Sequence, residues 1–491
     1  MNGKRVVALD LGSSSGRCVA GKFDGNRLSL ELVHRFPNAP VRVGESRYWD
    51  ILRIWAEIRT ALRKAGRSGG FDSIGTDGWG CDFALLDREG TLLQNIVSYR
   101  DRTVTAVREE VNALFSPAEL YKRVGVGSFT ASTACRLHYL AKNQPQVLDA
   151  AERLLFLPDY INYLLSGEKA CEYTIATTSQ FLNPVEKQWE KSVMERLSVP
   201  ERLMLPICGS GGRLGKIQGP LARELAVGPA EVIMTCGHDS AAAMAAVPAR
   251  PGERWLCISS GSWSVVGYEA ERAYLEEGPH IGRFLHEGRF GGKVRLVCNM
   301  IGLWMIQELR RAFSPLDYDR LEEEARRAVP FKTLIVPDHI PSMAVDNLPC
   351  AIQEYSKKTH QPVPQTVGEF VRCIYDSMAF NYAVIAREME QTVGMELPCI
   401  YLVGGGVHND LLSQITADIT GKVVVTGPVE AASAGNILVQ LIAQGELTNL
   451  DEAREVSAAS FPKKRFEPSG RQPDLSDACF EKLCETPLLI R

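Results

Sequence analysis

The first strand of the chain leads into a turn whose residue types could bind phosphate and a hydrated cation. A β-type run at residues 5–9 ends on Asp10 and opens into Leu11-Gly12-Ser13-Ser14-Ser15-Gly16-Arg17. Small residues let backbone N–H groups approach an anion closely, serine hydroxyls add donors, and a nearby carboxylate can hold a hydrated cation. The segment therefore predicts a phosphate-and-metal turn between two strands.

Two alternatives for this turn stay open on the local sequence alone. Residues 12–16 satisfy G-x-S-x-G, the nucleophile elbow of α/β hydrolases, with Ser14 as the nucleophile. That motif needs a helix after its strand, whereas residues 17–23 continue as β-type sequence towards a hairpin turn at residues 24–26. The other alternative is an ordinary Gly/Ser hairpin that binds nothing. Residues further along the chain must decide.

The same pattern recurs about half a chain later. Strand-type residues 255–258 lead into Ser259-Ser260-Gly261-Ser262, and another strand is expected at residues 263–267. Likewise, the run at residues 399–403 ends in Gly404-Gly405-Gly406, in the style of residues 74–78. Such self-similarity predicts two related lobes that face each other across a cleft, where ligands usually bind. Two turns of this kind suit a polyphosphate, because each offers donors to a different phosphate.

The commoner nucleotide-binding motifs do not fit the sequence. Residues 209–216 resemble a P-loop, but one residue too many separates Gly209 from Gly215, and Ile217 replaces the Ser or Thr that would hold Mg²⁺. No G-x-G-x-x-G follows a strand, so a Rossmann dinucleotide site is not expected.

A candidate general base follows the strand predicted at residues 232–235. There, Gly237-His238-Asp239-Ser240 opens an alanine-rich helix predicted at residues 240–246. Helix capping alone would explain Asp239. Its position at a strand end, close to a domain boundary expected at residues 248–252, favours a carboxylate that accepts a proton from an attacking hydroxyl.

Two further segments combine residue types that bind sugars. Gly78-Trp79-Gly80-Cys81-Asp82 offers glycine backbone, an aromatic face and a carboxylate, although Trp79 could equally belong to the core. Residues 299–307 are predicted to be one helix, in which the apolar residues pack and only Asn299, Gln307 and Gly302 invite a ligand.

The glycine run at residues 404–406 precedes a helix predicted at residues 411–419. Glycines there would let a flat base or a ribose approach the backbone, and Asn409 could hydrogen-bond to it. The alternative is that Asn409 is simply a helix N-cap after a glycine turn.

The remaining elements indicate an α/β organisation. A helix is expected at residues 49–65, strands at 73–75 and 83–86, and a mostly helical insertion at 102–205. The length of 491 residues predicts two domains, which we place at residues 1–248 and 249–491.

Composition narrows the classes of partner. The net charge of −4 argues against nucleic acid or an anionic membrane as the main partner. The 13 cysteines, from Cys18 to Cys484, include no C-x-x-C pair, which indicates a reduced cytoplasmic protein. No signal peptide is visible, and no apolar run approaches the ~18 residues of a membrane span.

Together the segments resemble the FGGY family of carbohydrate kinases, which belongs to the actin, Hsp70 and hexokinase superfamily. The resemblance covers nearly the whole chain. It rests on the order and spacing of these stretches: Asp10-Leu11-Gly12 with Ser14-Ser15-Gly16-Arg17, Trp79-Gly80 with Asp82-Phe83, Tyr99-Arg100-Asp101, Leu157-Pro158-Asp159-Tyr160, Glu172-Tyr173-Thr174 with Ala176-Thr177-Thr178, His238-Asp239, Ser259-Ser260-Gly261, Asn299 with Gly302-Leu303-Trp304 and Gln307, Val403-Gly404-Gly405-Gly406, and Gly427-Pro428-Val429-Glu430-Ala431.

The resemblance implies an α/β fold of two ribonuclease-H-like, actin-like ATPase domains that flank a deep catalytic cleft. The domain at residues 1–248 would bind sugar and the domain at 249–491 nucleotide. The implied reaction is ATP-dependent phosphorylation of L-rhamnulose at its 1-hydroxyl, in L-rhamnose catabolism. Alternatives are a kinase for L-fuculose or xylulose, or an actin- or Hsp70-like ATPase without sugar kinase activity. The implied partners are the sugar and ATP, without nucleic acid or membrane, in a monomer or small homo-oligomer.

The resemblance also assigns roles to single residues. Asp239 would be the proton acceptor, and Asp10 would hold ATP-bound Mg²⁺ through water. The implied ATP-binding residues are Ser13, Ser14, Ser15, Gly16, Arg17, Ser262, Gln307 and Gly405. The implied sugar-binding residues are Gly80, His238, Asp239, Ser240 and Asn299. The chain departs from the family pattern at Ser13, where alanine is familiar, at Ser240, Ser262 and Gly78, where threonine is familiar, and at Cys298, where a basic residue is familiar.

Overall fold

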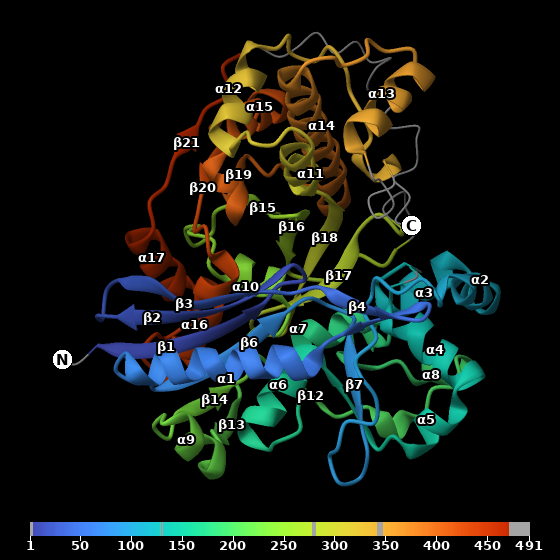
Figure 1. The fold of residues 1–491 in the computed structure, drawn as a ribbon, viewed down its shortest axis with the longest axis vertical. Helices are drawn as coiled ribbons and strands as arrows, with labels where there is room; N and C mark the ends of the chain where they lie inside the picture. The colour runs from blue at the N-terminus through green and yellow to red at the C-terminus, as the bar shows by residue number, and fades with distance from the viewer. Residues whose placement is uncertain (1–2, 128, 130, 277–280, 341–346, 471–491) are drawn as a thin grey trace. The chain divides into compact units, whose positions relative to one another are not determined.

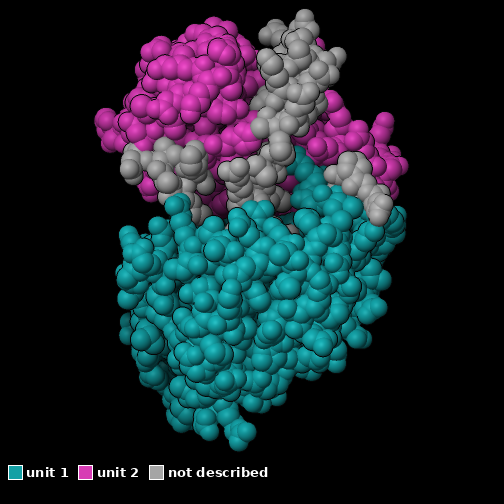
Figure 2. Space-filling model, turned by 90° about the vertical axis from the view of Figure 1, so that its right-hand side faces the viewer, with its two compact units in different colours: residues 1–251, 269–296, 430–461 teal, residues 252–268, 297–429, 462–491 magenta. Residues whose placement is uncertain are grey.

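The computed structural model describes residues 3–127, 129, 131–276, 281–340 and 347–470 (Figure 1). The chain divides into two compact units, which Figure 2 colours separately. The first unit comprises Met1–Pro251, Glu269–Leu296 and Glu430–Phe461, and the second comprises Gly252–Tyr268, Val297–Val429 and Pro462–Arg491. Each unit therefore contains segments that are distant in the sequence.

The first unit is built on a six-stranded sheet of order β13-β14-β6-β1-β2-β3. Its strands are β1 (Lys4–Leu11), β2 (Ser15–Phe23), β3 (Leu28–Pro37), β6 (Ser73–Gly78), β13 (Arg213–Lys216) and β14 (Glu231–Ile233). β1 pairs antiparallel with β2 and parallel with β6, which pairs parallel with β14. Because a strand and not a helix follows the first turn, the hydrolase-elbow alternative is excluded.

Side chains of β1 alternate between two cores, as the period of a strand requires. Val7 and Leu9 join the cluster that includes Ile54, Ile58 and Leu62 of α1 (Ile51–Arg67), whereas Val6 and Ala8 pack with residues of α16 (Ala431–Gln444). Each fully buried aliphatic side chain of this kind stabilises the fold by about 1.5–3 kcal/mol. In Figure 1, α1 runs along the sheet as a single long helix, and it confirms the helix expected at residues 49–65.

The segment from residue 102 to 205 is mostly helical among its described residues, as expected. It packs around a separate apolar cluster and includes four short strands that sequence periodicity did not indicate. Its elements are α2 (Thr105–Leu114), α3 (Pro117–Val124), α4 (Thr133–Asn143), α5 (Pro145–Ala150), β8 (Arg153–Phe156), α6 (Leu157–Ser166), β9 (Cys171–Glu172), α7 (Tyr173–Ala176), β10 (Leu182–Asn183), β11 (Gln188–Trp189) and α8 (Lys191–Arg196).

Further elements of the first unit flank this framework. They are β4 (Pro40–Val43), β5 (Ser46–Trp49), β7 (Phe83–Leu86), β12 (Ile207–Cys208), α9 (Gly219–Leu225), α10 (Asp239–Ala245) and α17 (Leu450–Ser460). β7 pairs antiparallel with β8, so the insertion is tied to the strand that follows the Gly80 segment.

A seven-stranded sheet of order β17-β18-β16-β15-β19-β20-β21 repeats this topology. Its strands are β15 (Trp255–Ser260), β16 (Trp263–Ala270), β17 (Leu285–Arg289), β18 (Lys293–Ile301), β19 (Cys399–Val403), β20 (Val423–Thr426) and β21 (Arg465–Phe466). β15 pairs antiparallel with β16 and parallel with β19, as β1 does with β2 and β6. The self-similarity expected from the sequence is therefore confirmed at the level of strand pairing.

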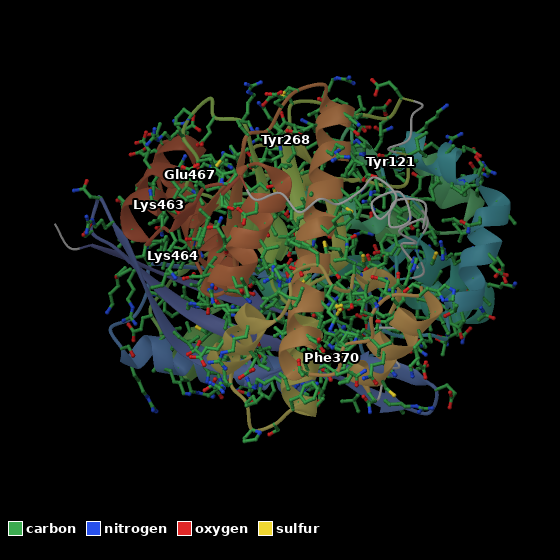
Figure 3. All side chains as sticks on the ribbon, turned by 90° about the horizontal axis from the view of Figure 1, so that it is seen from above. Tyr121, Tyr268, Phe370, Lys463, Lys464 and Glu467 are labelled. Carbon is green, nitrogen blue, oxygen red and sulfur yellow. The ribbon has the colours of Figure 1, made fainter. Side chains whose placement is uncertain are left out.

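Helices of the second unit pack beside its strands. They are α11 (Trp304–Ala312), α12 (Tyr318–Arg327), α13 (Leu348–Lys358), α14 (Val367–Val393) and α15 (Asp410–Thr420). The long helix α14 begins with a capping box between Thr366 and Glu369, and the ring of Phe370 lies 5.8 Å from that of Phe313 (Figure 3). Lys464, labelled in the same figure, donates to both carboxylate oxygens of Asp410 at 2.7 and 2.8 Å.

The helix predicted at residues 299–307 is wrong in its first half. Asn299 lies on β18, and α11 begins only at Trp304. Residues 299–301 continue β18 instead of starting a helix because Val294 to Cys298 are continuously buried in the sheet. In addition, the N–H of Gly302 donates to the carbonyl of Ser262 and not to a helical carbonyl.

Two expectations from composition, on membrane spans and on the cysteines, can be compared with the described residues. The helices of the described part of the chain include none long and apolar enough to cross a membrane. The eleven cysteines in the described residues are free thiols, while Cys479 and Cys484 lie outside that part.

Candidate active site

Three carboxylates gather at one edge of the first unit's sheet. Because β1, β6 and β14 are parallel, their carboxyl ends meet at the same edge, where α/β proteins bind ligands. Asp10 stands opposite Asp77 in the β1–β6 register, and Gly78 forms a bridge with His238, beside Asp239. Both Asp10 and Asp239 raise the pKa of Asp77, after the larger effect of desolvation.

Asp10 is buried at the end of β1, in a network of charged partners. Its Oδ2 accepts a hydrogen bond from Ser433 at 3.2 Å and lies 3.6 Å from Nε of Arg17, which also pairs with Glu430. Desolvation raises the pKa of Asp10, and Arg17 opposes that effect. A buried carboxylate at this strand end suits a water-mediated partner of a hydrated cation.

The first serine turn is fixed by its neighbours, and Ser13 Oγ also accepts a hydrogen bond from Nη2 of Arg100 at 3.2 Å. Asn38 donates through its backbone to Ser14 O at 3.0 Å and through its side chain to Gly12 O at 2.9 Å. A Cβ at Gly16 would lie 2.2 Å from the ring of Phe36, so a side chain there cannot fit. The side chain of Ser14 itself is exposed.

Asp239 is the first residue of α10, and His238 occupies the N-cap position without a side-chain capping bond. Oδ1 of Asp239 accepts the N–H of Ser240 at 2.6 Å. Desolvation raises the pKa of Asp239, with His238 lowering it and Asp10 raising it further. A carboxyl with a raised pKa at this edge is a chemically suitable proton acceptor.

The segment at residues 78–82, which contains Gly80, is fixed by the buried carboxylate of Asp82. Trp79 donates its indole N–H to Asp82 Oδ2 at 2.6 Å, and Trp49 donates to the same oxygen. Asp82 Oδ1 accepts from Arg136 at 2.6 Å. Trp79 is thus a core residue, which favours the structural alternative for it. A Cβ at Gly80 would lie 3.0 Å from Thr178, so the position favours glycine.

Sequence reasoning matched the segment Glu172-Tyr173-Thr174 without giving it a role. The carboxylate of Glu172 accepts the N–H of Gly237 at 2.9 Å, and Thr174 Oγ1 accepts the N–H of His238 at 3.1 Å. Asp77 was missed as well, although its place at the end of a buried strand repeats the position of Asp10. These residues reach the site through contacts between segments that are distant in the sequence, and local sequence patterns do not indicate such contacts.

The predicted ATP-binding residues of the second unit lie after β15 (Ser262), after β19 (Gly405) and on α11 (Gln307). Ser262 Oγ lies 3.2 Å from Nε2 of Gln307, and Trp304 donates its N–H to Ser262 O at 3.2 Å. Gly404 has a φ of 84°, and a Cβ there would lie 2.9 Å from Ser260 O, so the glycine run lies directly against the second serine turn. Gly405 is exposed with open space around it.

Two other residues singled out beside these turns have a clear position. Asn409 caps α15 by accepting the N–H of Leu412 at 2.8 Å, which supports the capping alternative. Asn299 is exposed on β18. Ser262, Gln307, Gly405 and Asn299 belong to the second unit, and the other predicted site residues belong to the first.

Residues 5–246 match the N-terminal domain, and residues 256–444 the C-terminal domain, of the FGGY family of carbohydrate kinases. The chain belongs to this family. The expected kinase class and the α/β fold with two sheet-containing domains are thereby confirmed.

Curated relatives of this family member match over nearly their whole length. A rhamnulokinase of Bacteroides thetaiotaomicron is 34% identical over 466 residues, which are 95% of this chain and 96% of that protein. A rhamnulokinase of Bacillus subtilis is 32% identical over 465 residues, covering 94% and 95%.

Solved structures of other kinases have the same fold as this chain. The ligand-bound xylulose kinase of Lactobacillus acidophilus superposes with a TM-score of 0.81 at 13% identity, covering 98% of this chain and 97% of that one. The glycerol kinase of Plasmodium falciparum with ADP gives 0.78 at 14% identity, covering 98% of both chains.

Proposed function

We propose that the chain transfers the γ-phosphoryl group of ATP to the 1-hydroxyl of L-rhamnulose, giving L-rhamnulose 1-phosphate and ADP in L-rhamnose catabolism. The observation that carries this proposal is the match to proteins named rhamnulokinase at 32–34% identity over 93–95% of the chain. The carboxylates at the edge of the first sheet supply the chemistry that the reaction requires.

In this reaction, Asp239 accepts the proton of the 1-hydroxyl as its oxygen attacks the γ-phosphorus. The bond between that phosphorus and the β,γ-bridging oxygen breaks, and ADP leaves with the bond's electron pair. Gly80, His238, Ser240 and Asn299 orient the ketose so that the 1-hydroxyl meets Asp239. The raised pKa of Asp239 supports its part as the base.

ATP is bound by the two serine turns and the residues beside them. Ser13, Ser14, Ser15, Gly16 and Arg17 form the first turn, and Ser262, Gln307 and Gly405 act from the second unit. Asp10 would hold ATP-bound Mg²⁺ through water, and the cation would screen the charge of the phosphates. The open space at Gly405 and the exposed Ser14 side chain support these assignments.

The test is ADP release measured against a panel of ketoses that includes L-rhamnulose, L-fuculose and xylulose. We expect ketose-dependent turnover that is greatest with L-rhamnulose and that falls by ~10²–10⁴ in Asp239→Asn. ATP hydrolysis that ignores both the sugar and the substitution would overturn the mechanism. Fast turnover of another ketose, with none of L-rhamnulose, would overturn the substrate alone.

A further inference from the structure

A buried ion pair between Arg295 and Glu287 contacts the imidazole of His238 in the first unit. Glu287 stands on β17 and Arg295 on β18, and the side chain of Arg295 is fully buried. Neither residue is among the predicted sugar- or ATP-binding residues, and the proposed reaction gives neither of them a role.

The guanidinium of Arg295 joins several polar groups at one point. Its Nη2 donates to Glu287 Oε2 at 2.6 Å and to Ser240 Oγ at 2.9 Å, and it lies 2.7 Å from Nδ1 of His238. Oε2 of Glu287 is itself 3.1 Å from the same Nδ1. The pair therefore contacts the side chains of two predicted sugar-binding residues.

Stability alone does not account for two charges in this place. Moving each charge out of water costs several kcal/mol, and apolar residues of similar volume are often as stable as a buried ion pair. Burial by itself raises the pKa of Glu287, yet His238 and Arg295 lower it to about 2, so the carboxylate is charged at neutral pH. A charged carboxylate keeps the guanidinium neutralised and fixed in orientation.

The strand that bears Glu287 is itself held closely. The N–H of Gly288 donates to Thr177 Oγ1 at 2.8 Å, and a Cβ at Gly288 would lie 2.7 Å from the ring of Tyr173. Nε of Arg295 donates to the carbonyl of Gly288 at 3.1 Å. The ion pair is thus anchored to backbone, which limits its freedom to move.

The contacts at Nδ1 decide which edge of the imidazole faces the proposed base. With Nδ1 against the ion pair, Nε2 of His238 lies 3.3 Å from Ser240 Oγ and 3.6 Å from Oδ1 of Asp239. Rotation of the ring would turn Nδ1 away from the ion pair and Nε2 away from Asp239.

We propose that Arg295 and Glu287 are positioning residues that fix the imidazole of His238 and the hydroxyl of Ser240 for the ketose. They act through those two side chains and do not touch the sugar themselves. This inference rests on the proposed function, because it assumes that His238 and Ser240 bind the sugar.

Steady-state kinetics of Glu287→Gln, which keeps the shape of the side chain and removes its charge, provide the first test. We expect kcat/KM for the ketose to fall by about 10²-fold, as a displacement of about 1 Å at a reacting centre can cause, while KM for ATP is unchanged. In Arg295→Lys, kcat/KM for the ketose is expected to fall by a similar factor, since an ammonium group cannot reproduce the planar fork of a guanidinium. The double variant should be no worse than either single one, because the two residues act as a unit.

Glu269→Gln is the matched control in the same unit. Glu269 is also a largely buried carboxylate, 11% exposed, and it forms ion pairs with Arg289 at 2.7 Å and Arg454 at 2.6 Å. We expect it to lower the melting temperature while leaving KM for both substrates unchanged. Equal behaviour of Glu287→Gln and Glu269→Gln would overturn the inference.

A second readout needs no turnover. The imidazole ¹⁵N signals of His238, assigned with His238→Asn, report the surroundings of both ring nitrogens in the ligand-free protein. We expect both signals to shift in Glu287→Gln and in Arg295→Lys and to stay in place in Glu269→Gln. Unchanged signals would overturn the inference. If the wild type turned over no ketose, the proposed function would fail, while these signals would still decide whether the pair positions the ring.

Discussion

The backbone N–H of Gly237 donates to Oε2 of Glu172 at 2.9 Å, across 65 residues of sequence. The same oxygen accepts from Thr174 Oγ1 at 2.6 Å and from the N–H of Ile175 at 3.0 Å. A Cβ at Gly237 would lie 3.0 Å from this oxygen, so the close approach favours glycine. The backbone just before Asp239 is therefore fixed by the carboxylate of Glu172, the N-cap residue of α7.

Replacing Glu172 by Gln should lower turnover more than stability. An amide keeps the volume but weakens charge-assisted bonds to the Gly237 segment, and we expect kcat to fall by about 10–10²-fold through misplacement of Asp239. Initial rates with saturating ketose and ATP give the measurement. Ser210→Ala is the control, because Ser210 donates at 2.5 Å to Oε1, the other oxygen. Full kcat in Glu172→Gln would contradict the positioning role.

Two adjacent glycines of the second unit should respond oppositely to alanine. Gly404 has a φ of 84° and no room for a Cβ beside Ser260, so Gly404→Ala should lower the melting temperature. Gly405 has open space, so Gly405→Ala should fold normally and raise KM for ATP, because the methyl group fills the surface offered to the nucleotide. Thermal unfolding and ATP titrations measure both effects. An unchanged KM in Gly405→Ala would remove this residue from the ATP site.

Asp82→Asn should destabilise the first unit strongly. The amide cannot accept all three donors, and it leaves the buried guanidinium of Arg136 without its carboxylate, a loss that costs about 3–5 kcal/mol. Urea unfolding gives the measurement. Glu224→Gln is the control, since Glu224 pairs with Arg59 and Arg63 at the surface, where such pairs contribute little to stability. Similar free energies of unfolding for the two variants would show that Asp82 is not the centre of this network.

Local patterns in the sequence were enough for the elements that carry the site. Alternation in β1, helical spacing in α1 and the small residues after Asp10 are properties of neighbouring residues, so the turn and its flanking elements could be predicted. The repeat of strand, serine turn and strand was visible for the same reason. Local pattern also pointed to the serine turn and to Asp239, whereas the roles proposed for the other single residues came from the family resemblance.

Relations between distant segments could not be predicted. Arg295 meets His238 across 57 residues, and α16 covers a face of the first sheet although it lies more than 400 residues after β1. Asn299 was placed on a helix because apolar residues at 300–306 fit a helical period, while the pairing partners of β18 were unknown. Such contacts depend on the order of strands in a sheet, which hydrophobic period does not encode.

Asp376 should give the second unit a distinct dependence of stability on pH. Its carboxylate accepts from Arg372 Nε at 2.7 Å and from the N–H of Phe331 at 2.6 Å, yet burial raises its pKa to about 6. A carboxyl with a raised pKa binds its proton more tightly in the folded state than in the unfolded chain. Its contribution to stability therefore falls as pH rises from its ordinary value of 3.8 to about 6, by about 3 kcal/mol in total.

Asp376→Asn removes this titration, so the free energy of unfolding should depend less on pH in the variant between pH 4 and 6.5. Urea unfolding at both pH values, followed by a probe in the second unit, measures the difference between the two proteins. At pH 4 the wild-type carboxyl is protonated and neutral, as the amide of the variant is, so the variant should gain stability relative to the wild type between pH 4 and pH 6.5. Parallel pH profiles would show that the Asp376 carboxyl has an ordinary pKa, and that Arg372 and the Phe331 N–H offset its burial completely.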